Sequence, residues 1–203
     1  LEKAMFQRKD DGIETLLEIA VSPEDDVEVR RLSLTNRSER SREIEITSYA
    51  ELALAPPTDD LAHPAFGKLF LETSYLPACS AILCGRRLRA SAEPGSWAIH
   101  ALSVEGRMQA QVEWETDRAK FLGRGRGPED PVALDGRPLS GSTGAVLDAV
   151  ASLRTRVRLA PGGFARVTFA TGTAASREAA VVLAGRYHNP SQAGRTFALA
   201  FTH

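Results

Sequence analysis

The chain has 203 residues, with 25 Lys plus Arg and 26 Asp plus Glu, so its formal net charge is -1. This length, with 43% hydrophobic residues, fits a domain that buries its own core without metal or disulfide support. The near-zero charge argues against a nucleic-acid partner held through phosphates, and no apolar run approaches the ~20 residues of a membrane span. We therefore expect a soluble segment that contacts neither nucleic acid nor membrane.

The charge is distributed unevenly along the chain. Residues 1–60 contain 15 acidic and 8 basic groups, whereas residues 61–203 contain 11 acidic and 17 basic groups. Two interpretations are open: the two parts pack against each other with complementary charge, or an acidic edge faces a partner.

The first 60 residues have the period-two pattern of β-strands. Strands are predicted at residues 15–21 and 27–34, and a phase change near Arg30 and Arg31 indicates a bulge or twist in the second one. Turn residues at 35–38 and alternation at 44–48 predict a β-hairpin with the strand at 27–34. The proline-rich stretch 55–60 ends this part of the sheet.

The middle of the chain continues as short strands separated by Gly and Pro. They are predicted at residues 70–75, 81–88, 97–104 and 111–116, with one helical turn or an ordered loop at 63–68. Residues 97–104 are apolar on both faces, which is typical of a strand covered on both sides. Cys79 and Cys84 are expected to be buried free thiols rather than a disulfide, and His63 and His100 lack zinc-ligand spacing to them, so no metal is predicted.

Residues 117–144 are rich in Gly and Pro and predict a long loop, which is usually functional or disordered. A second hairpin is predicted from strands at 150–159 and 166–173, with Arg154, Arg156 and Arg158 pointing outward. Helical spacing follows at 176–187, capped by Ser176, and at 191–201. The expected fold class is mainly β: a large antiparallel β-sandwich with C-terminal helices.

Few residues suggest chemistry. Alternating Arg and Gly at 123–127 permit either an anion- or sugar-binding loop or a solvated loop whose arginines pair with acids. Glu113, Glu115 and Asp117 share one strand face. They are interpreted either as the pair of carboxylates that a glycosidase needs or as the solvated edge of a sheet. Trp97 and Trp114 are sugar-stacking candidates or core residues.

Several short segments, in a fixed order, resemble a known family. They are VSPEDDVEVRRL at 21–32, TSYAEL at 47–52, HPAF at 63–66, KLF at 68–70, ETDR at 115–118, FLGRGR at 121–126, LSG at 139–141, GAVLD at 144–148 and SREA at 176–179. Their order and spacing resemble the region that precedes the catalytic barrel in cyclic β-1,2-glucan synthases. That region is related to inverting glycoside phosphorylases such as cellobiose phosphorylase, and the resemblance extends from about Gly12 to the end.

The resemblance implies a domain arrangement. Residues 1–174 would form the antiparallel sandwich, of the supersandwich, galactose-mutarotase-like type. Residues 175–203 would form a helical segment that leads to an (α/α)6 barrel outside this sequence. The chain opens without Met and without a signal peptide, so it is interpreted as a piece of a longer protein. The parent would build glucan from UDP-glucose in a membrane-embedded region and adjust chain length by phosphorolysis at the cytoplasmic face of the bacterial inner membrane.

The resemblance also implies what this segment does. The family's catalytic acid and phosphate-binding residues lie in the barrel, so no catalytic residue and no cofactor are predicted here. The expected partners are the barrel, a β-glucan and a second copy in a homodimer, and residues 121–126 match a loop lent to the sugar site. The candidate carbohydrate-binding residues are Arg124, Arg126, Asp117, Arg118, Trp97 and Trp114.

Two other functions fit the same sequence. One is an autonomous carbohydrate-binding sandwich, suggested by the two tryptophans and the Arg-rich loop. The other is an enzyme of the aldose-epimerase type, for which His100 with Glu113 or Glu115 is the acid–base pair that can be constructed.

Overall fold

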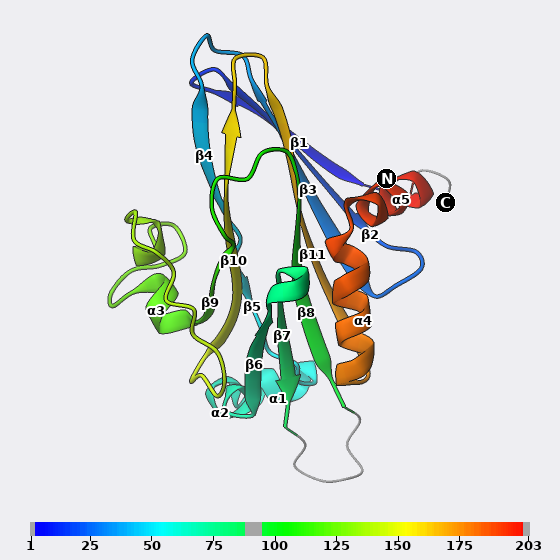
Figure 1. Cartoon of the computed structure of the whole chain (residues 1–203). Coiled ribbons are helices and arrows are strands. Elements are labelled where there is room, and N and C mark those ends of the chain that lie inside the picture. Colours follow the sequence, from blue (N-terminus) through cyan, green and yellow to red (C-terminus); the bar gives the residue numbers. More distant parts are fainter. Residues whose placement is uncertain (1–2, 88–94, 201–203) are drawn as a thin grey trace.

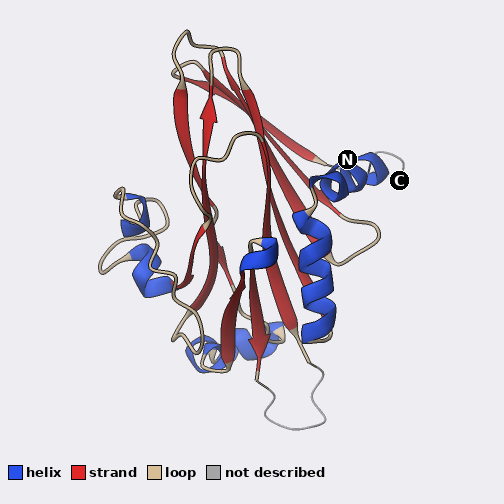
Figure 2. Cartoon of the chain, in the orientation of Figure 1, coloured by secondary structure: helices blue, strands red, loops and turns tan. Residues whose placement is uncertain are grey.

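Two antiparallel sheets face each other, and two C-terminal helices cover the outer face of the larger sheet (Figures 1 and 2). The computed structural model describes residues 3–87 and 95–200. The large sheet contains, in spatial order, β1 (Ala4–Asp10), β2 (Ile13–Val21), β3 (Val27–Asn36), β11 (Phe164–Ala174), β8 (Trp97–Glu105), β7 (Ala81–Arg86) and β6 (Leu71–Leu76). In the small sheet β10 (Ala149–Leu159) pairs with β4 (Arg42–Thr47), β5 (Ala50–Glu51) and β9 (Glu113–Asp117). The predicted fold class is confirmed.

The core lies between the two sheets, where alternate residues of each strand point inward. Leu153 and Val157 of β10 pack with Leu102 of β8 and Val167 of β11, and all four are fully or nearly fully buried. Burying each such side chain contributes about 1.5–3 kcal/mol. Strand β8 is buried on both faces, as its sequence predicted, because α4 covers the face opposite this core.

The phase change in β3 has a cause other than a bulge. The strand pairs in continuous register with β2 and β11 along its length, so the predicted bulge is wrong. Val27 and Val29 pack on the helix side, whereas Leu32 and Leu34 pack on the side of the small sheet. The hydrophobic phase changes because a different layer covers each half of the strand.

Both predicted hairpins are wrong, because their strands lie in different sheets. Residues 37–41 lead from β3 in the large sheet to β4 in the small one, and residues 160–163 lead from β10 back to β11 (Figure 1). The buried Asn36 joins these two crossovers: its Nδ2 donates to the carbonyls of Arg40, Leu159 and Ala160 at 2.7, 3.1 and 3.1 Å. Turn residues signal a reversal of direction but not the sheet in which the chain continues.

Helices α4 (Arg177–His188) and α5 (Pro190–Ala200) pack on the large sheet. The Ser176 hydroxyl accepts the Ala179 N–H at 3.1 Å, which is the predicted cap of α4. Tyr187 and Phe197 are buried with β2, β3, β7, β8 and β11 residues in a second apolar cluster. None of the helices in the described part of the chain is long and apolar enough to cross a membrane.

Shorter elements complete the chain. They are α1 (Pro57–Ala62), α2 (Pro64–Lys68), η1 (Pro77–Cys79), α3 (Arg118–Leu122) and η2 (Val132–Leu134). Cys79 and Cys84 are buried and free, and burial raises the pKa of Cys84 to about 12. Residue 88 of the predicted strand 81–88 and residue 201 of the predicted last helix lie outside the described residues.

The uneven charge is explained by packing between the two parts of the chain. Acidic residues among the first 60 form ion pairs with arginines of the later part: Glu24 with Arg195, Asp25 with Arg186, Glu45 with Arg154 and Arg156, and Glu51 with Arg118. These pairs agree with complementary packing of the two parts, although other acids of the first part, such as Glu14 and Glu18, pair within it.

Candidate functional site

The Gly- and Pro-rich segment folds into a lobe on the outer face of the small sheet. We call residues 117–144 the outer lobe (Figure 1). Phe121, Leu122 and Ala133 of the lobe are buried against Val150, which points outward from β10. The segment therefore has a small apolar core of its own, whereas most residues of 123–144 are exposed or half-buried.

Arg154 anchors this lobe, although the sequence pattern predicted that it points into solvent. Its side chain is 1% exposed, and its guanidinium donates to the carbonyls of Ala133 and Arg137 at 2.5 and 2.8 Å and to Thr47 Oγ1 at 2.9 Å. Glu45 and Glu113 lie 3.2 and 3.4 Å from it. The predicted outward face is correct, but the side chain is not exposed to solvent because the lobe covers the outer face of β10 at this residue.

The three acidic residues of β9 serve the lobe and do not form a glycosidase pair. Glu115 is 1% exposed and accepts the N–H groups of Thr116 and Asp117 at 2.9 and 3.0 Å and the Ser140 hydroxyl at 2.5 Å. Asp117 Oδ1 accepts the Ala119 N–H at 2.9 Å and so caps α3. Glu113 accepts the Leu139 N–H at 2.9 Å.

The predicted arginines have different surroundings. Arg126 pairs with Asp130 and Asp135 at 2.8 and 2.6 Å, which closes the loop and lowers the pKa of Asp135. Arg118 pairs with Glu51 at 2.9 Å, and this hydrogen bond lowers the pKa of Glu51. Arg124 is exposed and pairs with no acid in the described part of the chain, so its guanidinium is available to a ligand or partner.

The two tryptophans lie on different sides of the molecule. The Trp114 ring stacks on Tyr75 at 3.8 Å and 9° between the two sheets. Trp97 lies on the outer face of the large sheet, where it lines a groove of about 350 Å³. Asp117, Arg118, Arg124 and Arg126 all lie in the outer lobe, and the Trp114 ring borders Gly141 of that lobe from the inner side. Trp97 lies on the far face of the large sheet, so the six predicted residues do not form one site.

His100 lines a cavity of about 380 Å³ between the sheets, but it does not face the predicted acids. Its Nε2 lies 2.7 Å from the Ser48 hydroxyl and its Nδ1 lies 2.8 Å from the Thr171 hydroxyl. Glu113 and Glu115 face outward into the lobe contacts described above, so the proposed acid–base pair is wrong. Burial of the imidazole, with the positive charge of Arg30, lowers the pKa of His100 to about 4.

We expect His100 to make folding sensitive to mild acid. The unfolded chain binds the proton near the usual pKa of about 6.5, before the folded chain does, so stability is complete above that pH and falls as the pH drops to about 4. The loss is about 3 kcal/mol. Urea unfolding of the wild type and of His100→Gln at pH 7, 5.5 and 4 measures it, and equal pH dependence of the two proteins would contradict the assignment.

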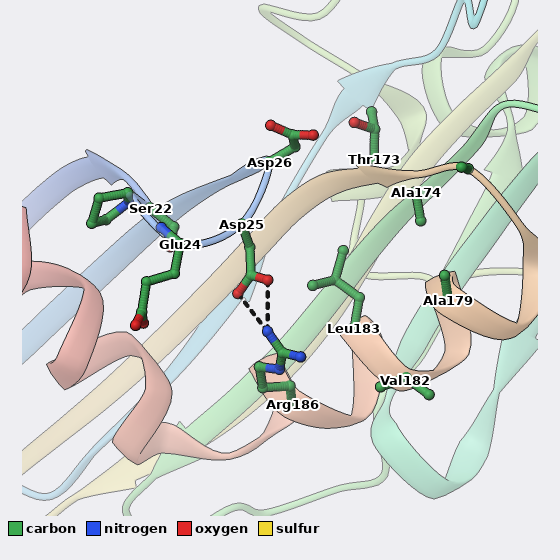
Figure 3. A pocket seen from close by; sticks show the side chains of 12 residues that line it. Ser22, Glu24, Asp25, Asp26, Thr173, Ala174, Ala179, Val182, Leu183 and Arg186 are labelled. Carbon is green, nitrogen blue, oxygen red and sulfur yellow. Dashed lines mark hydrogen bonds and ion pairs between the residues drawn. The ribbon is translucent and has the colours of Figure 1, made fainter.

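A further cavity, of about 470 Å³, lies where the helices meet the loop between β2 and β3 (Figure 3). Arg186 donates to both carboxylate oxygens of Asp25 at 2.6 and 2.8 Å, and Tyr187 donates to the same group at 3.1 Å. Arg195 pairs with Glu24. These ion pairs attach α4 and α5 to the sandwich. Neither at this cavity nor elsewhere do the described residues contain a group of three or more His, Cys, Asp or Glu side chains that could hold a metal ion.

Arg154 and Asn36 have structural roles that the sequence did not reveal. A sequence signal could have predicted the burial of Arg154. A long Gly- and Pro-rich segment that contains the apolar Phe121 and Leu122 needs an apolar surface to pack on, and its backbone carbonyls need a hydrogen-bond donor. No comparable signal marks Asn36, because its three acceptors come from two turns that are far apart in sequence.

The two sheets, the outer lobe and the helices on the large sheet define an antiparallel supersandwich domain. The family model described as "Glycosyl hydrolase 94, supersandwich domain" matches residues 1–190. The chain belongs to this family.

A curated relative and two solved structures are similar to the chain. It is 36% identical over 190 residues to "Cyclic beta-(1,2)-glucan synthase NdvB" of Rhizobium meliloti (strain 1021), covering 93% of this chain and 7% of that protein. A protein described as a kojibiose phosphorylase from the human microbiome aligns with TM-score 0.50 and 6% identity, over 96% of this chain and 22% of its own. The polysaccharide lyase BACCELL_00875 aligns with TM-score 0.49 and 12% identity, over 89% and 23%. The chain thus spans a small part of each of these proteins.

Proposed function

We propose that the chain is the non-catalytic β-sandwich domain of a cyclic β-1,2-glucan synthase and that it scaffolds a phosphorylase-like (α/α)6 barrel in the same polypeptide. The observation that carries the proposal is the 36% identity, over 93% of this chain, to a protein of that name. The chemistry of the described residues agrees, because each carboxylate of β9 is engaged in holding the outer lobe.

Residues 175–203 begin the helical connection to the barrel in this proposal. The Asp25–Arg186 and Glu24–Arg195 pairs hold α4 and α5 on the sandwich, so the connection starts from a fixed direction. The domain also contributes to a homodimer of the parent and works at the cytoplasmic face of the inner membrane, with the glucan bound by the parent.

The outer lobe is the part of the domain that reaches the carbohydrate site. Arg126 and Arg154 fix its backbone through two carboxylates and two carbonyls, which leaves Arg124 exposed on an ordered loop. A guanidinium on an ordered loop loses less conformational entropy on binding sugar hydroxyls than one on a flexible loop.

Two experiments test this function. The purified 203-residue chain should release no glucose 1-phosphate from β-1,2-glucan and phosphate, and release would contradict a non-catalytic role. In the full-length parent, Arg124→Ala should lower phosphorolysis of the glucan roughly tenfold, the effect of losing one charged hydrogen bond. Arg107→Ala, which removes another exposed arginine, is the matched control, and equal rates for the two variants would refute the loop contribution.

A further inference from the structure

A groove on the outer face of the large sheet combines an aromatic ring with an excess of positive charge. We call it the Trp97 groove; it has a volume of about 350 Å³ and lies at the end of β6, β7 and β8 near the start of α4. Besides backbone of Thr73 and Gly85, its lining residues are Glu72, Ser74, Arg86, Arg87, Trp97 and Arg177.

Gly85 determines how the ring lies. Glu72, Gly85 and Trp97 are paired across three neighbouring strands, so they form a row on one face of the sheet. A Cβ on residue 85 would lie only 2.6–2.8 Å from three carbons of the Trp97 benzo ring. The ring therefore lies flat over residue 85, and the backbone of Glu72 lies two strands from that of Trp97, roughly 10 Å across the sheet.

The polar groups around the ring carry more positive than negative charge. Arg87 and Arg177 line the groove with a single carboxylate, that of Glu72. Arg86 also borders it, but this residue pairs with the buried Leu71, so its side chain points to the other face of the sheet. Arg87 donates to the carbonyl of Leu69 at 3.0 Å, which fixes its position while leaving its charge uncompensated by any acid in the described chain.

Arg177 adds a cation where a helix disfavours one. It is the first residue of the 12-residue α4, whose N-terminal end carries positive partial charge, and it forms no ion pair with a described residue. An anion in the groove would be stabilised by Arg177, by Arg87 and by the helix end together.

We propose that the Trp97 groove binds a phosphorylated hexose. The apolar face of the pyranose stacks on Trp97, the phosphate lies near Arg177 and Arg87, and the sugar hydroxyls donate to Glu72. The Ser74 hydroxyl, which also lines the groove, is a further hydrogen-bonding group for the sugar. The site is separate from the outer lobe and goes beyond the scaffolding role, because it gives the domain a small ligand of its own.

Isothermal titration of the 203-residue chain with glucose 1-phosphate tests the site. We expect saturable binding with a Kd of about 1 mM or below, together with a change in Trp fluorescence. Inorganic phosphate and glucose should each bind at least roughly tenfold more weakly, because each supplies only one of the two interactions. Absence of saturation at a glucose 1-phosphate concentration about ten times the expected Kd would overturn the proposal.

Variants locate the binding. Arg177→Ala should weaken glucose 1-phosphate roughly tenfold, and Arg107→Ala, an exposed arginine outside the groove, should leave it unchanged. Trp97→Phe keeps an aromatic ring over Gly85 and should weaken binding less than Trp97→Ala does. Trp97→Ala removes packing contacts, so the folding of this variant is checked by circular dichroism. If the Trp97→Ala variant unfolds, Arg177→Ala still decides the result.

Three other results would refute the proposal. Equal affinity for inorganic phosphate would show a simple anion site without a sugar. Equal affinity for glucose or a neutral β-1,2-glucan oligosaccharide would show a neutral-sugar surface. Equal weakening by Arg107→Ala would place binding outside the groove. None of these results depends on the activity of the parent protein, so they are independent of the proposed function.

Discussion

Replacing Arg154 with methionine is expected to lower the free energy of unfolding by about 3–5 kcal/mol, since it leaves buried partners of a charged group unpaired. The carbonyls of Ala133 and Arg137 lose their donor, and Glu45 and Glu113 lose a cation next to them. Lysine keeps the charge but not the planar fork, so Arg154→Lys should cost about 2 kcal/mol. Urea unfolding measures both.

Arg158→Met provides the matched control. Arg158 lies on the same strand and the same face but is exposed, so its replacement should change stability by no more than about 0.5 kcal/mol. If the anchor holds the lobe, Arg154→Met should also speed proteolytic cleavage within residues 123–144. Equal stability and cleavage rates for Arg154→Met and Arg158→Met would show that the lobe is held by its apolar contacts alone.

Asn36→Asp is expected to lower stability by about 3 kcal/mol or more at pH 7. The substitution turns a donor that serves three carbonyls into a carboxylate that faces them, and a buried unpaired charge is costly. The loss should shrink as the pH falls, because a protonated aspartate can donate to one carbonyl again.

The chain contains a second asparagine that tests this explanation. Asn189 is exposed, and its Oδ1 accepts the Ser191 N–H at 3.0 Å, a role that aspartate can also fill. Asn189→Asp should therefore change stability by no more than about 0.5 kcal/mol. A similar loss in both variants, measured by urea unfolding at pH 7, would show that the crossovers do not depend on the Asn36 amide.

Local patterns predicted most of the strands but not their partners. They missed β1 (Ala4–Asp10), whose residues are all exposed and so show no apolar alternation. Residues 97–104 were correctly identified as a strand buried on both faces, because apolar residues occupy both alternating sets of positions. The partners of β4 and β11 depend on contacts with strands more than a hundred residues away, which turn residues do not encode.

The site residues show the same difference between what a local pattern predicts and what depends on distant contacts. Alternation placed Arg154 correctly on the face away from the core, but it carries no information that residues 117–144 later cover that face. Composition likewise marked Arg124 and Arg126 as equivalent, and the structure distinguishes them because Asp130 and Asp135 lie within reach of Arg126 only.

The position of β11 has a consequence for how the domain is made. This strand lies between β3 and β8 and supplies the hydrogen-bonded connection between the β1–β2–β3 and β8–β7–β6 halves of the large sheet. Until Phe164–Ala174 has left the ribosome, both halves have an open edge and an uncovered apolar face. Completion of the large sheet thus depends on β11, which is its last strand to be synthesised. Strands that are far apart in sequence also pair slowly. A nascent chain of this family is therefore most exposed to aggregation and proteolysis just before its β-domain is complete.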